Sequence, residues 1–268
     1  MRNIIAIANQ KGGVGKTTTV VNIAAGLAEQ GKKVLCIDLD PQGNLSDYLG
    51  YDFEQDKPTI IEVMKGTVAP SACILTNDSE NIDYIPADIT LATADMLLAQ
   101  MMCREQILKR AIANDRNLDD YDYIIIDCLP SLGMLVTNAL AAADSVIIPV
   151  QVQKFALNGI VQFEDIFNLV KNNLNPDISI LGILETMTDG TKMSHEVDAA
   201  LKERYGDLVF NTTISRRVEA ANSTAEQRSL ISRHNSVVGE QYRQLVQEIM
   251  GNEPVAEYDD EEEIENGI

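Results

Sequence analysis

Residues 9–19 read NQKGGVGKTTT, a glycine-rich stretch between an apolar run and a helical pattern. The glycines let the backbone turn tightly, so that its N–H groups can point at phosphate oxygens. A helix that begins near Lys16 adds the positive end of its dipole. In this arrangement Lys16 reaches the β- and γ-phosphates of a nucleotide, and the hydroxyl of Thr17 ligates Mg²⁺. The stretch therefore predicts a phosphate-binding loop that joins a strand to a helix.

The loop departs from the usual pattern, G-x-x-x-x-G-K-[ST], at its first position. The pattern has a glycine there, whereas this chain has Gln10. The next residue is Lys11, so the loop carries a second lysine five residues before Lys16. The phosphate-binding pattern alone assigns no function to Lys11.

Short apolar runs alternate with helical patterns along the rest of the chain. Such alternation is typical of right-handed βαβ units, and it predicts an α/β fold of P-loop NTPase type, with a mostly parallel twisted sheet and helices on both faces. Residues 1–251 are expected to form one domain. The predicted strands cover residues 3–9, 33–40, 81–88, 121–130, 144–151 and 179–187, and the predicted helices cover residues 16–31, 90–114, 132–143, 158–173, 194–206 and 236–251.

Carboxylates end two of the predicted strands. Asp38 and Asp40 end the run VLCIDLD, and Asp127 ends the apolar run YIIID. Open α/β sheets place ligand-contacting groups at the carboxyl ends of their strands, so these side chains are expected beside the phosphate loop. Asp127 has the position of a carboxylate that holds the water shell of Mg²⁺. Alone, Asp38 and Asp40 could be ordinary loop carboxylates.

Length and composition indicate a globular protein of the cytosol. The chain has 268 residues, of which 45% are hydrophobic and 23% are charged, and this suits one large domain with a buried core. No apolar run approaches the ~18 residues that cross a bilayer. The N-terminal apolar run is too short for a signal peptide, and no small-residue cleavage site follows it.

Four cysteines, Cys36, Cys73, Cys103 and Cys128, form no C-x-x-C pair and no finger-like spacing with a histidine. Cys36 and Cys128 lie in or beside apolar runs. We interpret the cysteines as small buried hydrophobic side chains. The alternative is an iron–sulfur cluster shared by two chains.

The charge is strongly negative and unevenly distributed. The formal net charge is −20, and residues 252–268 hold eight acids and no Lys or Arg, which leaves −12 for residues 1–251. This acidic tail has too few apolar residues to fold alone and is expected to be disordered. The charge of the body argues against a protein that coats itself in nucleic acid, but it leaves room for a local basic patch.

Five stretches together resemble the ParA family of DNA-partitioning ATPases, a deviant Walker A class of P-loop proteins that also includes MinD. They are KGGVGKTTT, DLDPQGN, YDYIIIDCLPSLG, TNALAAADSVIIPVQ and ILGILETM, and the resemblance runs from about residue 2 to about residue 250. It implies ATP and Mg²⁺ as cofactors, slow ATP hydrolysis, a homodimer with ATP and DNA binding without sequence preference. It also implies a ParB-type partner that triggers hydrolysis, and a cytoplasmic protein that joins the nucleoid in its ATP state. Because the loop begins so early, the chain resembles the short chromosomal type, which lacks an N-terminal helix-turn-helix domain.

The resemblance also implies a role for each site residue. Lys11 would cross an ATP-sandwich dimer and touch the partner's phosphates, as an arginine finger supplied in trans does. Asp40 would orient the attacking water, Asp38 would lie near the Mg²⁺ shell, and Gly12 would pack where two chains meet. The implied catalytic residues are Lys11, Lys16 and Asp40; the implied ATP contacts are Lys11, Gly12, Gly13, Val14, Gly15, Lys16, Thr17, Thr18 and Thr186; and the implied metal residues are Thr17, Asp38 and Asp127.

The implied DNA-binding face departs most from the family pattern. The family's D-x-R-T reads DGTKMS here, with Lys192 displaced by one position. Its I-P-R-N reads ISRRV, so Ser215 replaces proline, Arg216 is kept and Arg217 is added. Its DCPPS reads DCLPS, with Leu129. The implied DNA-binding residues are Lys192, Arg216, Arg217, Arg228 and Arg233.

Three other functions fit parts of the pattern. A MinD-like ATPase that cycles on membranes ends in a basic amphipathic helix, whereas this chain ends EPVAEYDDEEEIENGI, which an anionic membrane would repel. No membrane partner is therefore expected. A reductase-type ATPase needs cysteines at a dimer face. A regulator that kept the ATP switch but binds a protein cargo would suit the acidic body.

Overall fold

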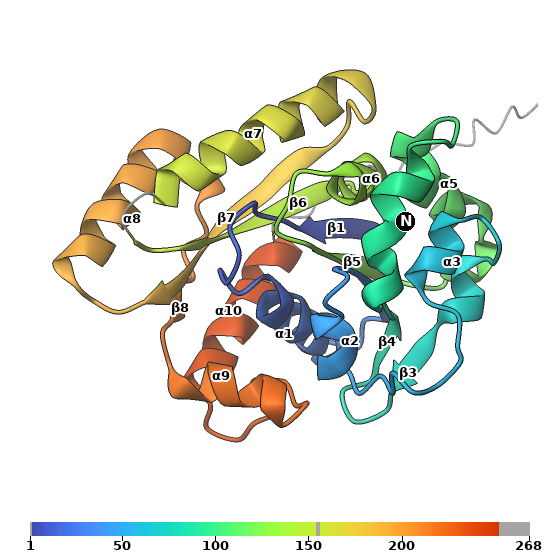
Figure 1. Ribbon diagram of the computed structural model, residues 1–268. Coiled ribbons are helices and arrows are strands. Elements are labelled where there is room, and N and C mark those ends of the chain that lie inside the picture. Colours follow the sequence, from blue (N-terminus) through green and yellow to red (C-terminus); the bar gives the residue numbers. More distant parts are fainter. Residues whose placement is uncertain (1, 154–155, 252–268) are drawn as a thin grey trace, which may run out of the picture.

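The computed structural model describes residues 2–153 and 156–251, and its centre is an eight-stranded sheet. The strands lie in the order β3-β4-β2-β5-β1-β6-β7-β8 (Figure 1). Neighbours pair in parallel, except that β3 and β4 pair antiparallel. The sheet confirms the predicted fold class. The strands are β1 (Asn3–Ile7), β2 (Val34–Leu39), β3 (Leu75–Asn77), β4 (Ile82–Ile85), β5 (Tyr123–Cys128), β6 (Ser145–Gln151), β7 (Ser179–Thr188) and β8 (Ile214–Ser215).

Helices cover both faces of the sheet (Figure 1). α1 and α10 share one apolar core with one face, and α5, α6 and α7 share a second core with the other. The helices are α1 (Lys16–Glu29), α2 (Asn44–Tyr48), α3 (Ile60–Met64), α4 (Ala94–Leu98), α5 (Ile107–Asn114), α6 (Met134–Ala142), α7 (Ala156–Asn173), α8 (Lys192–Tyr205), α9 (Val218–Ala225) and α10 (Val237–Gly251). Every residue of β2 and of β5 is buried, because helices on both faces leave these central strands no solvent side.

The strand order brings three connections to one edge of the sheet. β1 lies between β5 and β6, so the loop after it leaves near the middle of the carboxyl edge. The turns after β2 and β5 leave from the same edge, since these strands are parallel to β1. The register between β2 and β5 places Asp38 directly opposite Asp127. The sheet thus carries the predicted carboxylates to the phosphate loop.

The single long helix predicted over residues 90–114 is wrong. This segment instead forms a 3₁₀ turn (Ile89–Thr93), α4, a second 3₁₀ turn (Arg104–Gln106) and α5. Cys103, between the two helices, has a left-handed backbone with φ of 50°, which interrupts a right-handed helix. Leu98 and Ile107 are both buried, yet nine residues span about two and a half helical turns. A continuous helix would point these two side chains to opposite sides, and the break lets both reach the core.

Three further predictions concern the burial of the cysteines, the acidic tail and membrane-spanning helices. Cys36, Cys73 and Cys128 are buried as predicted, but Cys103 is exposed, so the interpretation of that cysteine as buried is wrong. The acidic tail, residues 252–268, lies outside the described residues. In the part of the chain that is described, no helix has the length and apolar character that crossing a bilayer requires.

Candidate functional site

The loop between β1 and α1 has the backbone of an anion-binding site. Gly13 and Gly15 have φ of 71° and 86°, a region that side chains rarely adopt. An added Cβ on either glycine would meet no atom within 4 Å, so the requirement for glycine comes from the backbone rather than from lack of space. α1 begins at Lys16 with no side-chain cap and no acid in its first turn. Its first N–H groups therefore remain available to a phosphate.

Side-chain hydrogen bonds to two neighbouring strands fix the loop in place. Asn9 donates through Nδ2 to the carbonyl of Pro149 in β6 at 2.7 Å, and its Oδ1 accepts from the N–H of Lys11 at 3.0 Å. Thr186 in β7 donates through Oγ1 to the carbonyl of Val14 at 2.9 Å. The loop is thus preorganised by β6 and β7, which lie beside β1 in the sheet. Sequence analysis predicted Thr186 as a nucleotide contact and gave Asn9 no role.

The two lysines of the loop have different surroundings. The side chain of Lys16 is 7% exposed, and its Nζ donates to the carbonyl of Lys11 at 3.2 Å. Burial lowers the pKa of Lys16, and the nearby carboxylate of Asp127 acts in the opposite direction. Lys11 is partly exposed, and its Nζ lies 3.4 Å from Oε1 of Gln151 at the end of β6. Lys16 therefore lies inside the loop, whereas Lys11 lies on the rim, where a second molecule can approach.

Thr17 and Asp127 form the centre of the predicted metal site. The hydroxyl of Thr17 donates to Oδ2 of Asp127 at 2.7 Å. Asp127 is 1% exposed, and burial, together with the opposed Asp38, raises its pKa well above the usual value. Oδ1 of Asp127 is buried and has no hydrogen-bond partner among the described residues. A buried carboxylate oxygen without a partner is costly, and hard cations such as Mg²⁺ prefer oxygen ligands, so these residues fit Mg²⁺ and its water shell.

Asp38 organises the turn that follows β2. Its Oδ2 accepts from the N–H and the hydroxyl of Ser46 at 2.9 and 2.7 Å, and its Oδ1 accepts from the N–H of Asp40 at 3.0 Å. Burial raises the pKa of Asp38 to about 6, although these hydrogen bonds act in the opposite direction. Oδ1 of Asp40 accepts from the N–H of Gln42 at 2.9 Å. Asp38 thus sets the position of Asp40, and its own place near the Mg²⁺ shell stays a prediction.

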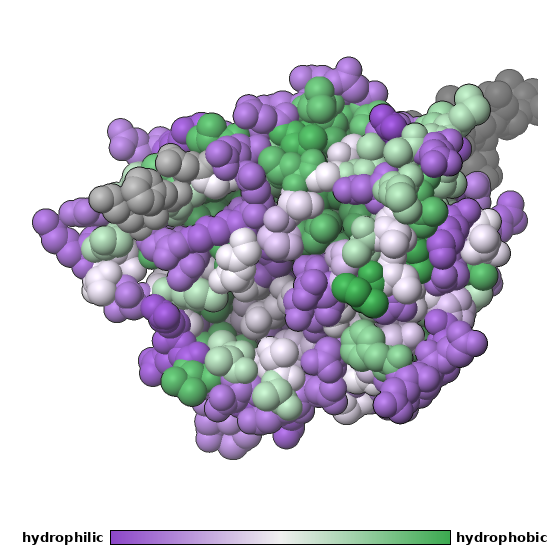
Figure 2. Space-filling model, in the orientation of Figure 1, coloured by the Kyte–Doolittle hydropathy of each residue, from purple (hydrophilic) through white to green (hydrophobic). Residues whose placement is uncertain are grey.

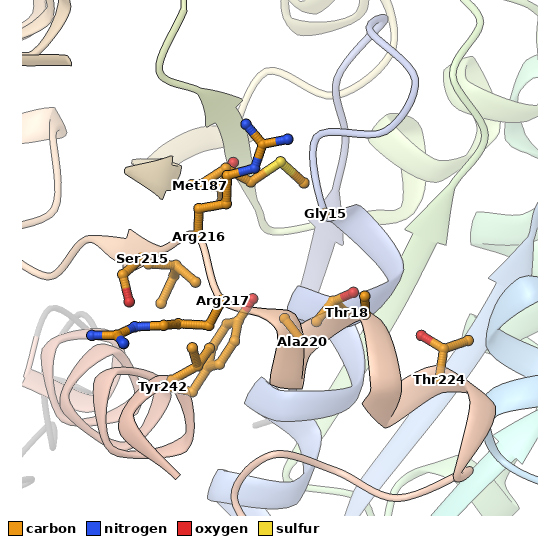
Figure 3. Close-up of a pocket in the computed structure, with 13 residues that line it drawn as sticks. Gly15, Thr18, Met187, Ser215, Arg216, Arg217, Ala220, Thr224 and Tyr242 are labelled. Carbon is orange, nitrogen blue, oxygen red and sulfur yellow. The ribbon is translucent and has the colours of Figure 1, made fainter. Parts of the chain in front are cut away.

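A cavity of about 320 Å³ opens beside the phosphate loop. Gly15 and Thr18 form one wall, and Met187 and Tyr242 are among the residues that form the others (Figure 3). Ile214 also lines the cavity. The lining is mostly apolar, and its volume lies within the range of small-molecule sites. An apolar cavity that adjoins a phosphate loop suits the base of a nucleotide. Sequence analysis missed this cavity, because its walls come from β7, β8, α9 and α10, far from the loop along the chain.

Comparisons with known proteins agree with this geometry. A family model described as an AAA domain matches residues 2–180. The chain is 42% identical over 264 residues to the sporulation initiation inhibitor protein Soj of Bacillus subtilis, across 94% of this chain and 100% of Soj. It is 36% identical over 252 residues to the chromosome partitioning protein ParA of Caulobacter vibrioides, across 93% and 94% of the two chains. The chain belongs to the ParA family of partitioning ATPases.

A solved structure extends the likeness of this ParA-family chain to the fold. Cobyrinic acid a,c-diamide synthase from Mycobacterium smegmatis is 39% identical, and the alignment covers 92% of this chain and 93% of that one with a TM-score of 0.80. That protein was solved with ADP and magnesium and with an ATP analogue and magnesium. Family membership confirms the class predicted from the five motifs, a P-loop ATPase of the partitioning type.

The five predicted DNA-binding residues of this ParA-family chain come from different segments, and their role stays a prediction. Arg216 and Arg217 line the cavity, and their guanidinium groups point in different directions (Figure 3). Arg228 and Arg233 lie between α9 and α10, where Arg228 donates to the carbonyl of Ser232 at 2.8 Å and Arg233 pairs with Glu226 at 2.6 Å. Lys192 begins α8 and lies 3.4 Å from Glu196. Among the five residues, only Arg216 and Arg217 adjoin the candidate nucleotide site.

Proposed function

We propose that this chain is an ATP-dependent switch that dimerises on ATP, binds DNA without sequence preference and hydrolyses ATP slowly to partition a chromosome or plasmid with a ParB-type partner. The observation that carries this proposal is that the two lysines of the loop lie in different surroundings. One lysine, Lys16, is buried beside Thr17 and Asp127, and the other, Lys11, remains on the rim. In this proposal the outer lysine acts on the nucleotide of a partner subunit.

ATP binding would use groups that the fold already holds in place. The N–H groups of residues 12–17 would surround the phosphates, and Lys16 would exchange its carbonyl partner for phosphate oxygens. The base would enter the cavity between Met187 and Tyr242. Thr17 and Asp127 would hold Mg²⁺, which neutralises charge on the β- and γ-phosphates. Each contact uses an element at the carboxyl edge of the sheet.

Hydrolysis would require two further groups. Asp40, held by its N–H to Asp38, would orient a water molecule toward the γ-phosphorus. The water oxygen forms a bond to phosphorus as the bond to the β,γ-bridging oxygen breaks, which releases ADP and phosphate. Lys11 would act on the phosphates of the partner subunit, where a cation stabilises the charge of the transition state. Turnover is slow in this proposal, because the site is complete only in the dimer and in contact with the partner protein.

Gly12 supports a dimer at this face. A Cβ added to Gly12 would meet only Pro130, at 3.9 Å, and that is ordinary contact. Within one chain, therefore, a Cβ at this position meets no obstacle. A Gly12→Val variant should fold and bind ATP as a monomer but fail to dimerise, since the obstruction arises only when two loops meet.

DNA binding would belong to the ATP state in this proposal. Arg216 and Arg217 line the cavity, so a nucleotide bound there would change their position in this proposal. The protein would be cytoplasmic, associated with the nucleoid as an ATP dimer and released when a ParB-type partner triggers hydrolysis.

The experiment that tests the proposed function is DNA binding measured with ATP, with ADP and without nucleotide. Tight binding of unrelated duplexes in ATP alone is the expected result. Equal binding in all three states would contradict the nucleotide switch. Absence of DNA binding, together with ATP-dependent sedimentation on anionic liposomes, would favour a MinD-like function instead. Absence of both would favour a switch that binds a protein cargo.

A further inference from the structure

The end of strand β6 holds the outer lysine of the loop at two points. Gln151 is the last residue of β6, and its Oε1 lies 3.4 Å from Nζ of Lys11. Two residues earlier in the strand, the carbonyl of Pro149 accepts from Nδ2 of Asn9, whose Oδ1 accepts from the N–H of Lys11. β6 therefore fixes the backbone of Lys11 through Asn9 and its amine through Gln151.

Strands on both sides fix the backbone of Gln151. The sheet register pairs Gln151 with Thr186 of β7, whose hydroxyl donates to the carbonyl of Val14 in the loop. On the other side β6 pairs with β1, which leads into the loop. Sites built on strands are positioned more precisely than sites on loops, so Gln151 gives the amine of Lys11 a defined position.

The partner of the amine is an uncharged amide, and the contact is weak. No ion pair that includes Lys11 occurs in residues 2–153 and 156–251. The distance of 3.4 Å between Nζ and Oε1 exceeds the roughly 2.7–3.2 Å of a typical N–H···O hydrogen bond. Figure 2 shows mostly purple and white areas over the segment that joins β1 to α1, so the surroundings of the loop are polar and the amine keeps its charge.

A weak and neutral partner suits a lysine that has to leave its own chain. A carboxylate at position 151 would add the attraction of opposite charges to the hydrogen bond. That ion pair would have to break before the amine could reach the phosphates of a partner subunit. The amide of Gln151 orients the amine without neutralising its charge, which stays available to those phosphates.

We propose that Gln151 is a positioning residue for the nucleotide switch: its amide holds the amine of Lys11 on the rim of the loop until the phosphates of a partner subunit replace it. The contact between Gln151 and Lys11 lies within one chain and does not depend on the proposed function. Its role in dimerisation rests on the proposed function.

The test compares two exchanges at position 151 with wild type in the full chain. Gln151→Glu keeps the shape of the side chain and adds a negative charge, whereas Gln151→Met keeps its approximate length and leaves only a weak acceptor. Gln30→Glu makes the same change of charge on an exposed residue beyond the far end of α1, and it is the matched control.

The first measurement is the pKa of Lys11 without nucleotide, followed through the signal of ¹³Cε-labelled lysine that is missing in Lys11→Ala. In wild type, burial holds this pKa below its usual value. Gln151→Glu should raise the pKa by about one unit or more, because a carboxylate within hydrogen-bond reach favours the charged amine. Gln30→Glu should leave the pKa of Lys11 as it is in wild type.

The second measurement is the protein concentration at which half of the chains are dimers in saturating ATP, determined by sedimentation. Gln151→Glu should raise this concentration at least about tenfold at low salt, and its ratio to wild type should fall as salt screens the ion pair. Gln151→Met should raise it about threefold, because the amine loses its defined position and must be ordered when the dimer forms.

Two results would overturn the role of Gln151. An unchanged pKa of Lys11 in Gln151→Glu would show that the two side chains do not meet. Dimerisation of Gln151→Met at the wild-type concentration would contradict a positioning role even if Gln151→Glu dimerised poorly, because an added carboxylate repels phosphate on its own.

Wild type and the control separate this role from the proposed function. A wild-type chain that stays monomeric in ATP would contradict the proposed function, and with it the role of Gln151 in dimerisation. If wild type, Gln30→Glu and both variants at position 151 all dimerised at the same concentration, the role of Gln151 alone would be contradicted.

Discussion

The phosphate loop and the arginine segment after β8 both border the same cavity, yet they are held in different ways. The loop is fixed by Asn9 and Thr186, and its buried lysine donates to a carbonyl within the loop. Arg216 and Arg217 form no ion pair with another described residue, and their guanidinium groups point apart (Figure 3). The difference teaches that the loop is shaped before its ligand arrives, whereas the two arginine side chains, of which Arg216 interacts electrostatically with Asp189, are not fixed by an ion pair.

Loss of the buried lysine should have the largest effect. Lys16→Ala removes the charge that the loop would hold at the β- and γ-phosphates, and Lys11 lies on the rim rather than inside the loop. Affinity for a fluorescent ATP analogue should fall by roughly 100-fold or more, as expected when charge-assisted hydrogen bonds to phosphate are lost. Lys32→Ala, just beyond the end of α1, is the control and should bind normally. Unchanged affinity of Lys16→Ala would show that the loop does not bind phosphate.

Asp40→Ala should separate binding from turnover. The phosphate loop is intact in this variant, so ATP affinity should stay close to wild type while the hydrolysis rate falls by about 100-fold or more, the usual effect of losing a group that positions the reacting water. The ATP dimer should accumulate. The assay is phosphate release with the partner protein absent and present. A hydrolysis rate within about twofold of wild type would contradict a catalytic role for Asp40.

The arginine segment can be tested by a pair of double variants. Arg216→Ala with Arg217→Ala should weaken DNA binding and reduce the salt slope of log K by about two, one unit for each phosphate contact. Arg228→Ala with Arg233→Ala should change the slope less, because these arginines already bond to Ser232 and Glu226. The measurement is fluorescence anisotropy of a labelled duplex across a salt series in ATP. A larger change in salt slope for the Arg228 and Arg233 double variant would place the DNA-binding face between α9 and α10.

The pH dependence of stability provides the smallest expected effect. The pKa of Asp38 is raised to about 6 in the folded chain by burial, above its unfolded value of about 3.9. The stabilisation from the protonated carboxyl is therefore complete below about pH 4 and is lost as pH rises through about 6. Relative to Asp38→Asn, wild type should lose about 1–3 kcal/mol of unfolding free energy across this interval without nucleotide. Urea unfolding at several pH values measures this free energy. If the unfolding free energies of wild type and Asp38→Asn changed in parallel with pH, the raised pKa of Asp38 would be contradicted.

Sequence alone predicted the parts of this molecule whose geometry is local. A glycine loop followed by a helix carries its own backbone requirement, so Lys16 and Thr17 could be placed without tertiary information. Asp127 could be placed too, because a parallel strand that ends in a carboxylate delivers it to the known edge of the sheet. The helical periodicity of residues 90–114 predicted one long helix, which was wrong. The helix is interrupted because Leu98 and Ile107 both pack in the core, and a continuous helix would point them to opposite sides.

The remaining parts depend on contacts between distant segments. The cavity combines Gly15 with Tyr242, and no pattern in the sequence connects them. The partners of Arg228 and Arg233, Ser232 and Glu226, could not be read from the sequence either, and the predicted DNA-binding role of the arginines stays a prediction. Short elements such as α2, α3 and β8 were missed, since two to five residues hold little more than one structural period.

The central claim is that Lys11 acts across an ATP dimer. Sedimentation of Lys11→Ala with ATP, which measures its oligomeric state, tests this claim most directly. If Lys11 acts across the dimer, the variant should bind ATP with an affinity close to wild type and yet remain a monomer that hydrolyses little ATP, while wild type and Lys32→Ala form dimers. A Lys11→Ala variant that dimerises with ATP and hydrolyses it at the wild-type rate would contradict the account, because the outer lysine would then have no role in the switch.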